Sequence, residues 1–212
     1  MQNCDLKRLL FCENSFGSAK PILSLKNNSY FSLHRANYPS DFPKKKVVSI
    51  LLVLSDLAKS EFAEDLFSAD SRFFHAKDNV PHCEGCFGCW KGNVASCVKK
   101  DEVSLFSSMM SECSELLILS QNTFGSYSPQ VKNVLDRSIS YVLPDFTVRR
   151  GEMHHKSRYK NSFLLSVLFY GKNDERQKKT AERLVHANAL NLNVPVKSIC
   201  FLENIKDLER NS

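Results

Sequence analysis

Apolar positions follow two different periods along this chain from about residue 46 onward. Three continuous apolar runs have the character of strands that are buried on both faces: KVVSILLVLSD (46–56), SELLILSQ (114–121) and SFLLSVLFYG (162–171). The shorter segments SRFFHA (71–76) and KSICFL (197–202) predict two further strands. These five apolar segments therefore predict five strands.

Segments with helical periodicity lie between these strands. Apolar residues recur at helical spacing over four segments: 57–67, 101–113, 128–143 and 174–192. The third segment opens with Ser128 and Pro129, a capping residue followed by proline at the first helical position. Alternating strands and helices predict an α/β fold, in which a doubly wound parallel sheet has helices on both faces and right-handed crossovers.

Residues 1–45 do not follow this alternation. They contain clusters of Asn, Ser and Pro, such as KNNSY and ANYPSDFP, and show no internal repeat. We interpret residues 1–45 as an irregular N-terminal extension, and residues 46–212 as the folded domain.

Composition and charge limit the class of protein and the partners to expect. Apolar residues make up 42% and charged residues 25% of the chain, as in an ordinary globular protein. The 29 Lys and Arg residues against 23 Asp and Glu are spread over short separate runs, so we expect no nucleic-acid partner. No apolar run is long enough to cross a bilayer and no signal peptide is evident, so we expect no membrane partner and a cytoplasmic location.

Ligands of an open parallel sheet bind beyond the carboxyl ends of its strands. The loops that follow the predicted strands should therefore form the site. These loops are LAKSEF after the first strand, the cysteine-rich stretch after SRFFHA, QNTFGSYSPQ after ELLILS, and YGKND after LLSVLF.

The cysteine-rich stretch HCEGCFGCWKGNVASC (82–97) holds half of the chain's eight cysteines and its only tryptophan. Cys83, Cys86, Cys89 and Cys97 have the spacing C-x2-C-x2-C-x7-C. Three thiolates at intervals of three can converge on one centre, and ferredoxin-like segments hold iron-sulfur clusters with the same start. The spacing therefore favours these four cysteines as metal ligands, with a 4Fe–4S cluster as the metal group.

Three alternatives remain open for these cysteines. A structural zinc site more often uses two separated C-x2-C knuckles. A redox dithiol would need only two of the four thiols. Passive cysteines could fill small buried positions around glycine turns.

Two strings carry a family resemblance. CEGCFGCWKGNVASCVKKDE (83–102) and NTFGSYSPQVKNVLDR (122–137) resemble the flavodoxin-like NAD(P)H-dependent FMN reductases and, within them, the iron-sulfur flavoproteins with a compact cysteine motif. The string LPDFTVRRGEMHHKSRY (143–159) resembles a subgroup of these oxidoreductases. The similarity covers about residues 46–205 and implies a flavodoxin-like fold with FMN as cofactor and NAD(P)H as electron donor.

The resemblance also implies which residues contact the flavin ring. One set lies in the loop after the third strand and comprises Asn122, Thr123, Phe124, Gly125, Ser126 and Tyr127. Tyr170 and Gly171 flank the ring from the loop after the next strand. An aromatic face can stack on isoalloxazine, and glycine lets backbone N–H groups approach its polar edge.

The first loop departs from the family pattern. A loop rich in Gly, Ser, Thr and Asn usually holds the FMN phosphate at a helix N-terminus, whereas this chain has SDLAKSEF. Ser55, Lys59 and Ser60 can contribute to phosphate binding, but Asp56 and Glu61 repel a phosphate dianion. We therefore expect weakened phosphate binding.

Paired histidines follow Gly151-Glu152-Met153 ahead of the last two strands. His154 and His155 are candidate catalytic residues on the substrate side, because imidazole titrates near neutral pH and can donate to a substrate carbonyl. A surface loop with no catalytic role is the alternative.

These features together predict an FMN-dependent oxidoreductase. It would pass electrons from NAD(P)H or a protein donor to a small-molecule or redox-protein acceptor, while the flavin carries the chemistry. The resemblance implies a homodimer. The alternative is a metal-binding or interaction protein that kept the fold and the cysteine loop but lost the flavin.

Overall fold

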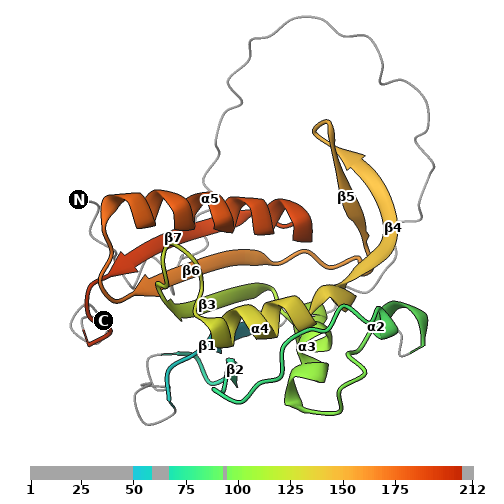
Figure 1. Ribbon diagram of the computed structural model, residues 1–212, viewed down its shortest axis with the longest axis horizontal. Helices are drawn as coiled ribbons and strands as arrows, with labels where there is room; N and C mark the ends of the chain where they lie inside the picture. Colours follow the sequence, from blue (N-terminus) through green and yellow to red (C-terminus); the bar gives the residue numbers. More distant parts are fainter. Residues whose placement is uncertain (1–49, 59–66, 93–94, 207–212) are drawn as a thin grey trace, which may run out of the picture.

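The computed structural model describes residues 50–58, 67–92 and 95–206, which include a five-stranded parallel sheet (Figure 1). Its strands are β1 (Leu51–Ser55), β2 (Arg72–His75), β3 (Glu115–Gln121), β6 (Leu164–Tyr170) and β7 (Val196–Leu202). They lie in the order β2-β1-β3-β6-β7, and each neighbouring pair is parallel. This is the strand order of flavodoxin-like sheets. The predicted fold class and its five strands are confirmed.

The central strands are apolar on both faces because both faces carry a core. Leu52 and Leu54 of β1 belong to the larger apolar cluster, whereas Val53 between them belongs to a smaller cluster on the opposite face. Helices α3 (Phe106–Glu112), α4 (Pro129–Arg137) and α5 (Glu175–Leu192) all contribute to the larger cluster. The smaller cluster includes Leu57 and Phe67, which border the undescribed residues 59–66.

Two helices begin at the residues that the sequence predicts, and each has a capping residue at its N-terminus. The Ser128 hydroxyl accepts a hydrogen bond from the amide of Val131 at 3.3 Å, and the Asp174 carboxylate accepts one from the amide of Gln177 at 2.7 Å. The prediction for residues 174–192 is confirmed. The helix predicted over 57–67 lies mostly on residues 59–66, outside the described part of the chain.

Two predicted helices are shorter than expected. The segment 101–113 divides into a 3-10 turn, η3 (Glu102–Leu105), and the helix α3. Helix α4 ends at Arg137 rather than near residue 143, because the chain continues as a 3-10 turn, η4 (Ile139–Tyr141), and then as a strand that contains Pro144. Proline has no amide hydrogen and cannot extend a helix.

A β-hairpin stands away from the sheet, and the periodicity does not predict it. Strands β4 (Val142–Arg149) and β5 (Glu152–Ser157) pair antiparallel and project from the body (Figure 1). Arg150 and Gly151 form the turn, both with positive φ (52° and 83°), as a two-residue hairpin loop requires.

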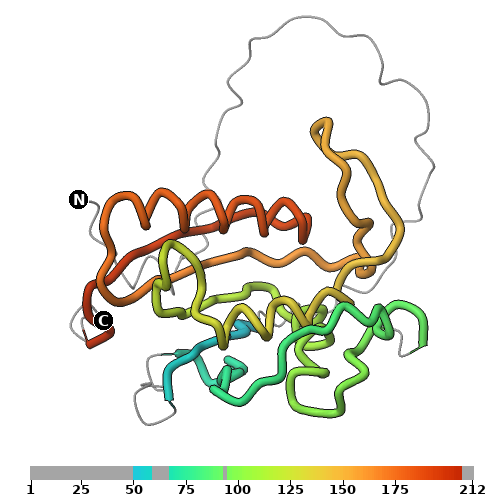
Figure 2. Tube along the Cα trace, in the orientation of Figure 1, coloured from blue at the N-terminus to red at the C-terminus, as the bar shows by residue number. Residues whose placement is uncertain are grey.

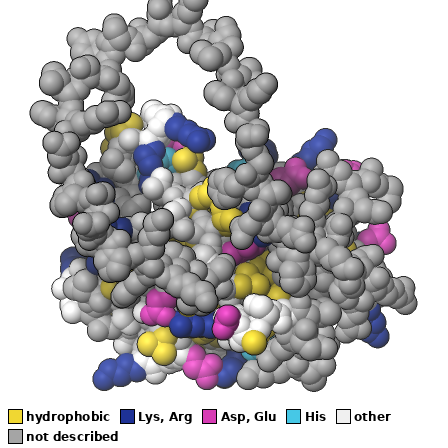
Figure 3. All heavy atoms as spheres, turned by 180° about the vertical axis from the view of Figure 1, so that it is seen from behind, with side chains coloured by type: hydrophobic (Ala, Val, Ile, Leu, Met, Phe, Trp, Pro, Cys, Tyr) yellow, Lys and Arg dark blue, Asp and Glu magenta, His cyan; other side chains and the backbone are white. Residues whose placement is uncertain are grey.

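Charged side chains of both signs are distributed over the described surface. Lys and Arg side chains lie among Asp and Glu on the face seen from behind and form no continuous basic stripe among the residues coloured there (Figure 3). Among the described helices, none combines the length and apolarity that a bilayer crossing needs. Residues 1–45 lie outside the described part, so their division from the folded domain stays a prediction.

Candidate functional site

The carboxyl ends of β1, β3 and β6 meet at one edge of the sheet, called here the carboxyl edge. Ser55 is in register with Leu119, and Gln121 with Tyr170. Ser55 itself is buried, and its hydroxyl accepts a hydrogen bond from the amide of Leu57 at 3.0 Å. Lys59 and Ser60 lie outside the described residues.

Asp56 connects all three strand ends. Its carboxylate accepts one hydrogen bond from the amide of Gln121 and one from the hydroxyl of Tyr170, both at 2.9 Å. A carboxylate thus occupies the point between β1 and β3 where the strand order reverses. A phosphate group placed there would meet a like charge.

The loop after β3 is a tight turn with an exposed aromatic ring. Thr123 and Ser126 exchange backbone hydrogen bonds at 2.9 and 3.0 Å, which leaves Phe124 and Gly125 at positive φ. The Phe124 side chain is 88% exposed. A Cβ on Gly125 would lie 2.7 Å from that of Thr180, so packing against α5 requires glycine at this position.

The structure also shows the surroundings of Tyr127, Asn122 and Gly171, which were predicted to contact the flavin ring. Tyr127 is buried against Phe169, with ring centroids 5.4 Å apart, and burial raises its pKa to about 12. It is part of the core and offers no surface to a flavin. Asn122 accepts a hydrogen bond from the amide of Gly125 at 2.8 Å and also pairs with Asn173. Gly171, at φ 99°, has among the described residues only the Gln121 side chain within contact of its Cβ position, so these residues leave the backbone there approachable.

The cysteine-rich stretch does not join this edge, which corrects the expectation that all loops after the strands form one site. After β2 the chain runs along α4 toward its far end (Figure 2). Gln130 donates to Asp78 at 2.7 Å, and Asn133 donates to the carbonyl of Val80 at 3.3 Å. Helix α4 has nine residues and is about 13 Å long, and the chain follows it away from the carboxyl edge.

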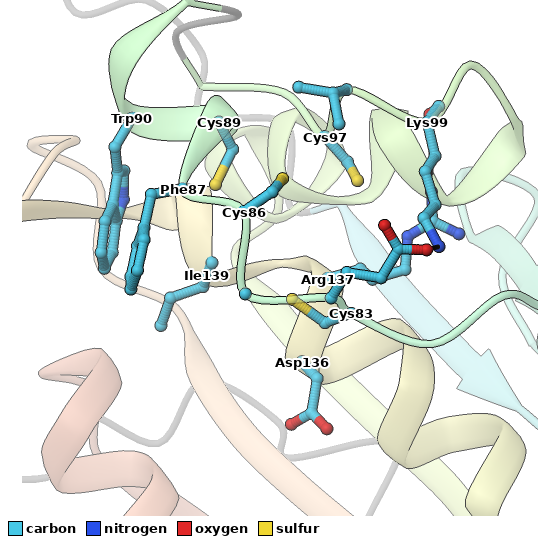
Figure 4. A pocket seen from close by; sticks show the side chains of 13 residues that line it. Cys83, Cys86, Phe87, Cys89, Trp90, Cys97, Lys99, Asp136, Arg137 and Ile139 are labelled. Carbon is cyan, nitrogen blue, oxygen red and sulfur yellow. Dashed lines mark hydrogen bonds and ion pairs between the residues drawn. The ribbon is translucent and has the colours of Figure 1, made fainter.

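Four thiols surround one cavity at the far end of α4. The side chains of Cys83, Cys86, Cys89 and Cys97 point toward a common space of about 340 Å³ (Figure 4). The short helix α2 (Gly88–Lys91) supplies Cys89 and Trp90, and the Trp90 indole donates to the carbonyl of Val142 at 3.0 Å. We call this space the cysteine pocket.

Burial and charge distinguish the members of the cysteine pocket. Burial raises the pKa of the Cys89 thiol, and the three neighbouring thiols raise it further. Lys99 lines the same cavity and pairs with Glu84 at 2.6 Å. Among the described residues, no three His, Cys, Asp or Glu side chains lie close enough to hold a single metal ion.

The paired histidines lie on the hairpin. His154 is buried, and its two ring nitrogens lie 3.1 Å from the Asn191 side chain and 3.2 Å from Glu152. The His155 ring lies between Trp90 and Phe146, at centroid distances of 4.9 and 4.7 Å. Both histidines line a second cavity of about 270 Å³ between the hairpin, α4 and α5. Within one chain they lie beside the cysteine pocket, and the carboxyl edge is at the other end of α4.

The sequence was compared with known protein families and with individual proteins. The model of a family described as NADPH-dependent FMN reductase matches residues 47–187, well over half of the chain. The chain belongs to this family.

One curated member of similar sequence is the iron-sulfur flavoprotein of Archaeoglobus fulgidus, with 28% identity over 107 residues. That match covers 50% of this chain and 49% of the relative, so the chain spans about half the length of the curated relative it matches.

Solved structures of similar shape are more distant. A FMN-dependent NADH-azoreductase from Bacillus anthracis in complex with FMN shares 11% identity at a TM-score of 0.49, covering 77% of this chain and 93% of that one. General stress protein 14 from Treponema denticola in complex with FMN shares 12% identity at a TM-score of 0.44, covering 77% and 91%.

The FMN reductase family implies a flavin, and the described carboxyl edge fits one in part. Phe124 offers an exposed ring, and Gly171 offers open backbone. Asp56 is unfavourable for the phosphate, and Tyr127 is withdrawn into the core. Membership of the family alone implies no cluster, yet the cysteine pocket fits one, because four thiols face a single cavity.

Sequence reasoning missed one charged residue that lines the cysteine pocket, Arg137. Arg137 lies at the end of α4 and directly follows Asp136 in the sequence. The two do not pair with each other: Asp136 binds Lys132 at 2.6 Å, whereas Arg137 binds Asp101 at 2.6 Å. The available signal was the apolar face of α4, since Arg137 follows Val134 by three residues and so shares its buried side.

Proposed function

We propose that this protein is an FMN-dependent oxidoreductase that passes electrons from NAD(P)H or a protein donor to a small-molecule or redox-protein acceptor. The family match over residues 47–187 is the observation that carries the proposal. The strand order agrees with it, because flavodoxin-like sheets bind FMN at this switch point.

The carboxyl edge would hold the flavin. Phe124 would stack on the ring, and Tyr170 and Gly171 would flank it, with Asn122, Thr123 and Ser126 shaping the turn between them. Ser55, Lys59 and Ser60 would approach the phosphate. When bound, FMN supplies hydride acceptance and electron release, and the chain's own residues bind, orient and shield it.

A substitution at the exposed ring tests this location. In the full-length protein, Phe124→Ala should weaken FMN binding by roughly threefold to tenfold, the value of one aromatic contact. Leu105→Ala is the matched control, since Leu105 is also an exposed apolar residue but lies on η3, away from the carboxyl edge and from the hairpin. Equal FMN affinities for the two variants, measured by flavin fluorescence titration, would place the flavin elsewhere.

We also propose that the cysteine pocket holds a 4Fe–4S cluster. The shared cavity, the ligand spacing and the similarity to an iron-sulfur flavoprotein support it. Cys83, Cys86, Cys89 and Cys97 would be the four ligands, and the bound group would supply one-electron chemistry.

A homodimer would bring together features that one chain keeps apart. Phe146, Val148 and Met153 are 58%, 68% and 70% exposed on the hairpin, an apolar surface that a second copy can cover. In such a dimer, His154 and His155 remain candidate substrate-side residues for the neighbouring flavin. Cys83, Cys86, Cys89 and Cys113 carry free thiols, which supports a cytoplasmic location.

The second candidate is a metal-binding or interaction protein without flavin, and Asp56 is the observation that favours it. An absorbance spectrum of protein purified without oxygen distinguishes the two. Flavin bands that bleach on addition of NADPH or NADH support the oxidoreductase. A spectrum that lacks flavin bands even after incubation with FMN supports the second candidate.

A further inference from the structure

Arg137 is a fully buried charge in the wall of the cysteine pocket. Its side chain is 0% exposed, and it is among the largest fully buried side chains of the described chain. Taking a guanidinium out of water is costly unless strong partners compensate it. The position of Arg137 therefore calls for an explanation in terms of its partners.

Its partners lie at both ends of the cysteine-rich stretch. One guanidinium nitrogen donates to the carbonyl of Pro81 at 3.3 Å, two residues before Cys83. The other donates to the carbonyl of Lys99 at 3.5 Å, two residues after Cys97. One side chain from α4 thus fastens both ends of the stretch to the domain.

The ion pair between Arg137 and Asp101 is oriented with respect to the cysteine pocket. The Asp101 carboxylate accepts two hydrogen bonds from Arg137, at 2.6 and 2.7 Å, in the bidentate geometry that is strongest for this pair. Arg137 lines the cavity that the thiols share, whereas the Asp101 side chain is 33% exposed and does not line it. The positive member of the pair therefore lies nearer the sulfur atoms.

One hydrogen-bond donor of Arg137 is not satisfied by the described residues. Its Nε is buried and has no hydrogen-bond partner among the described residues. Buried donors without partners are rare in folded proteins and point to a group that completes the site. Asp101 already balances the charge of Arg137, so what Nε lacks is an acceptor, and a group held in the cysteine pocket could supply it.

We infer that Arg137 is a positioning and tuning residue for a cluster in the cysteine pocket, holding the two ends of the thiolate stretch and raising the cluster's reduction potential. This inference rests on the proposed cluster. One-electron reduction, by dithionite or by a reduced flavin, adds negative charge to a group that four thiolates already make anionic. A nearby buried cation stabilises that reduced state.

Two charge changes of opposite sense test the inference. Arg137→Gln removes the cation and should make the cluster's midpoint potential more negative. Asp101→Asn leaves the cation uncompensated and should make the potential more positive. Arg137→Lys keeps the charge but not the bidentate geometry, so its shift should be smaller than that of Arg137→Gln.

The measurement is a redox titration of the full-length protein followed by electron paramagnetic resonance. Arg72→Gln is the control, since Arg72 pairs with Glu112 in an exposed ion pair outside the cysteine pocket, and its potential should equal the wild-type value. If Arg137→Gln fails to fold by circular dichroism, Asp101→Asn still decides the sign of the effect.

The possible failures are distinguishable. A wild-type cluster whose potential is unchanged in Asp101→Asn, or shifted in the negative direction, overturns the role of Arg137 and leaves the cluster standing. A wild-type protein without iron after anaerobic purification overturns the proposed cluster, and the role of Arg137 with it.

Discussion

The cysteines that the structure describes differ in what surrounds them. Cys113 is buried at the end of α3, donates to the carbonyl of Met110 at 3.3 Å, and burial raises its pKa to about 12. Cys83 and Cys86 are exposed. Cys113 is thus an inert core thiol, whereas the four thiols of the cysteine pocket can reach one ligand.

Replacing each pocket cysteine by serine should therefore have one common effect. Loss of any one of Cys83, Cys86, Cys89 or Cys97 opens the cluster to solvent, so iron content should fall to a similar low level in all four variants. Cys200→Ser is the control and should keep its iron. Iron loss confined to two adjacent cysteines would favour a dithiol instead.

Asp56 gives a second prediction, about the phosphate. Asp56→Asn removes a negative charge at the carboxyl edge while an amide oxygen can still accept from Gln121, so FMN should bind roughly twofold to thirtyfold more tightly. Riboflavin, which has no phosphate, should bind as before. Asp145→Asn on the exposed hairpin is the matched control. A gain for riboflavin equal to that for FMN would show that charge is not the cause.

At the scale of elements, the N-terminal cap of α5 leads to a prediction about stability. Asp174→Ala removes the acceptor for the Gln177 amide and should lower the free energy of unfolding by about 1 kcal/mol. Glu182→Ala, at an exposed mid-helix position, should change it by less than about 0.5 kcal/mol. Urea denaturation measures both. Equal losses would mean that the cap contributes nothing.

The elements also show how far the sequence predicts this fold. Buried strands are recognisable because both faces of the sheet demand apolar residues, as Leu52 and Val53 illustrate by serving opposite clusters. The C-terminal ends of helices were less predictable than their capped N-terminal ends, because α4 stops at Arg137 although the helical spacing of apolar residues continues. The hairpin gave little signal, since its strands are largely exposed and the apolar Phe146, Val148 and Met153 face solvent.

The candidate site was predicted less completely than the fold. Spacing identifies the four thiols, but the path of residues 76–82 along α4 depends on tertiary hydrogen bonds such as the one between Gln130 and Asp78. The pairing of Arg137 with Asp101 spans 36 positions and has no local signature. Residues that act through distant partners are thus visible only in the structure.

At the scale of the whole molecule, the carboxyl edge and the cysteine pocket lie at the two ends of α4, a helix about 13 Å long. The proposed homodimer would bring the two sites together through the exposed hairpin. Light scattering of the full-length protein should give the mass of a dimer, and Phe146→Asp should shift the population toward monomer. Leu105→Asp, which alters an exposed leucine away from the hairpin, should not. A wild-type monomer at all concentrations would contradict the dimer.

The most direct test of the account is the iron and acid-labile sulfide content of protein produced and kept without oxygen. If the four thiols of the cysteine pocket hold one cluster, each chain should contain about four iron atoms and about four sulfide ions. Iron and sulfide near zero, in protein that is folded and retains all its thiols, would contradict the proposed cluster.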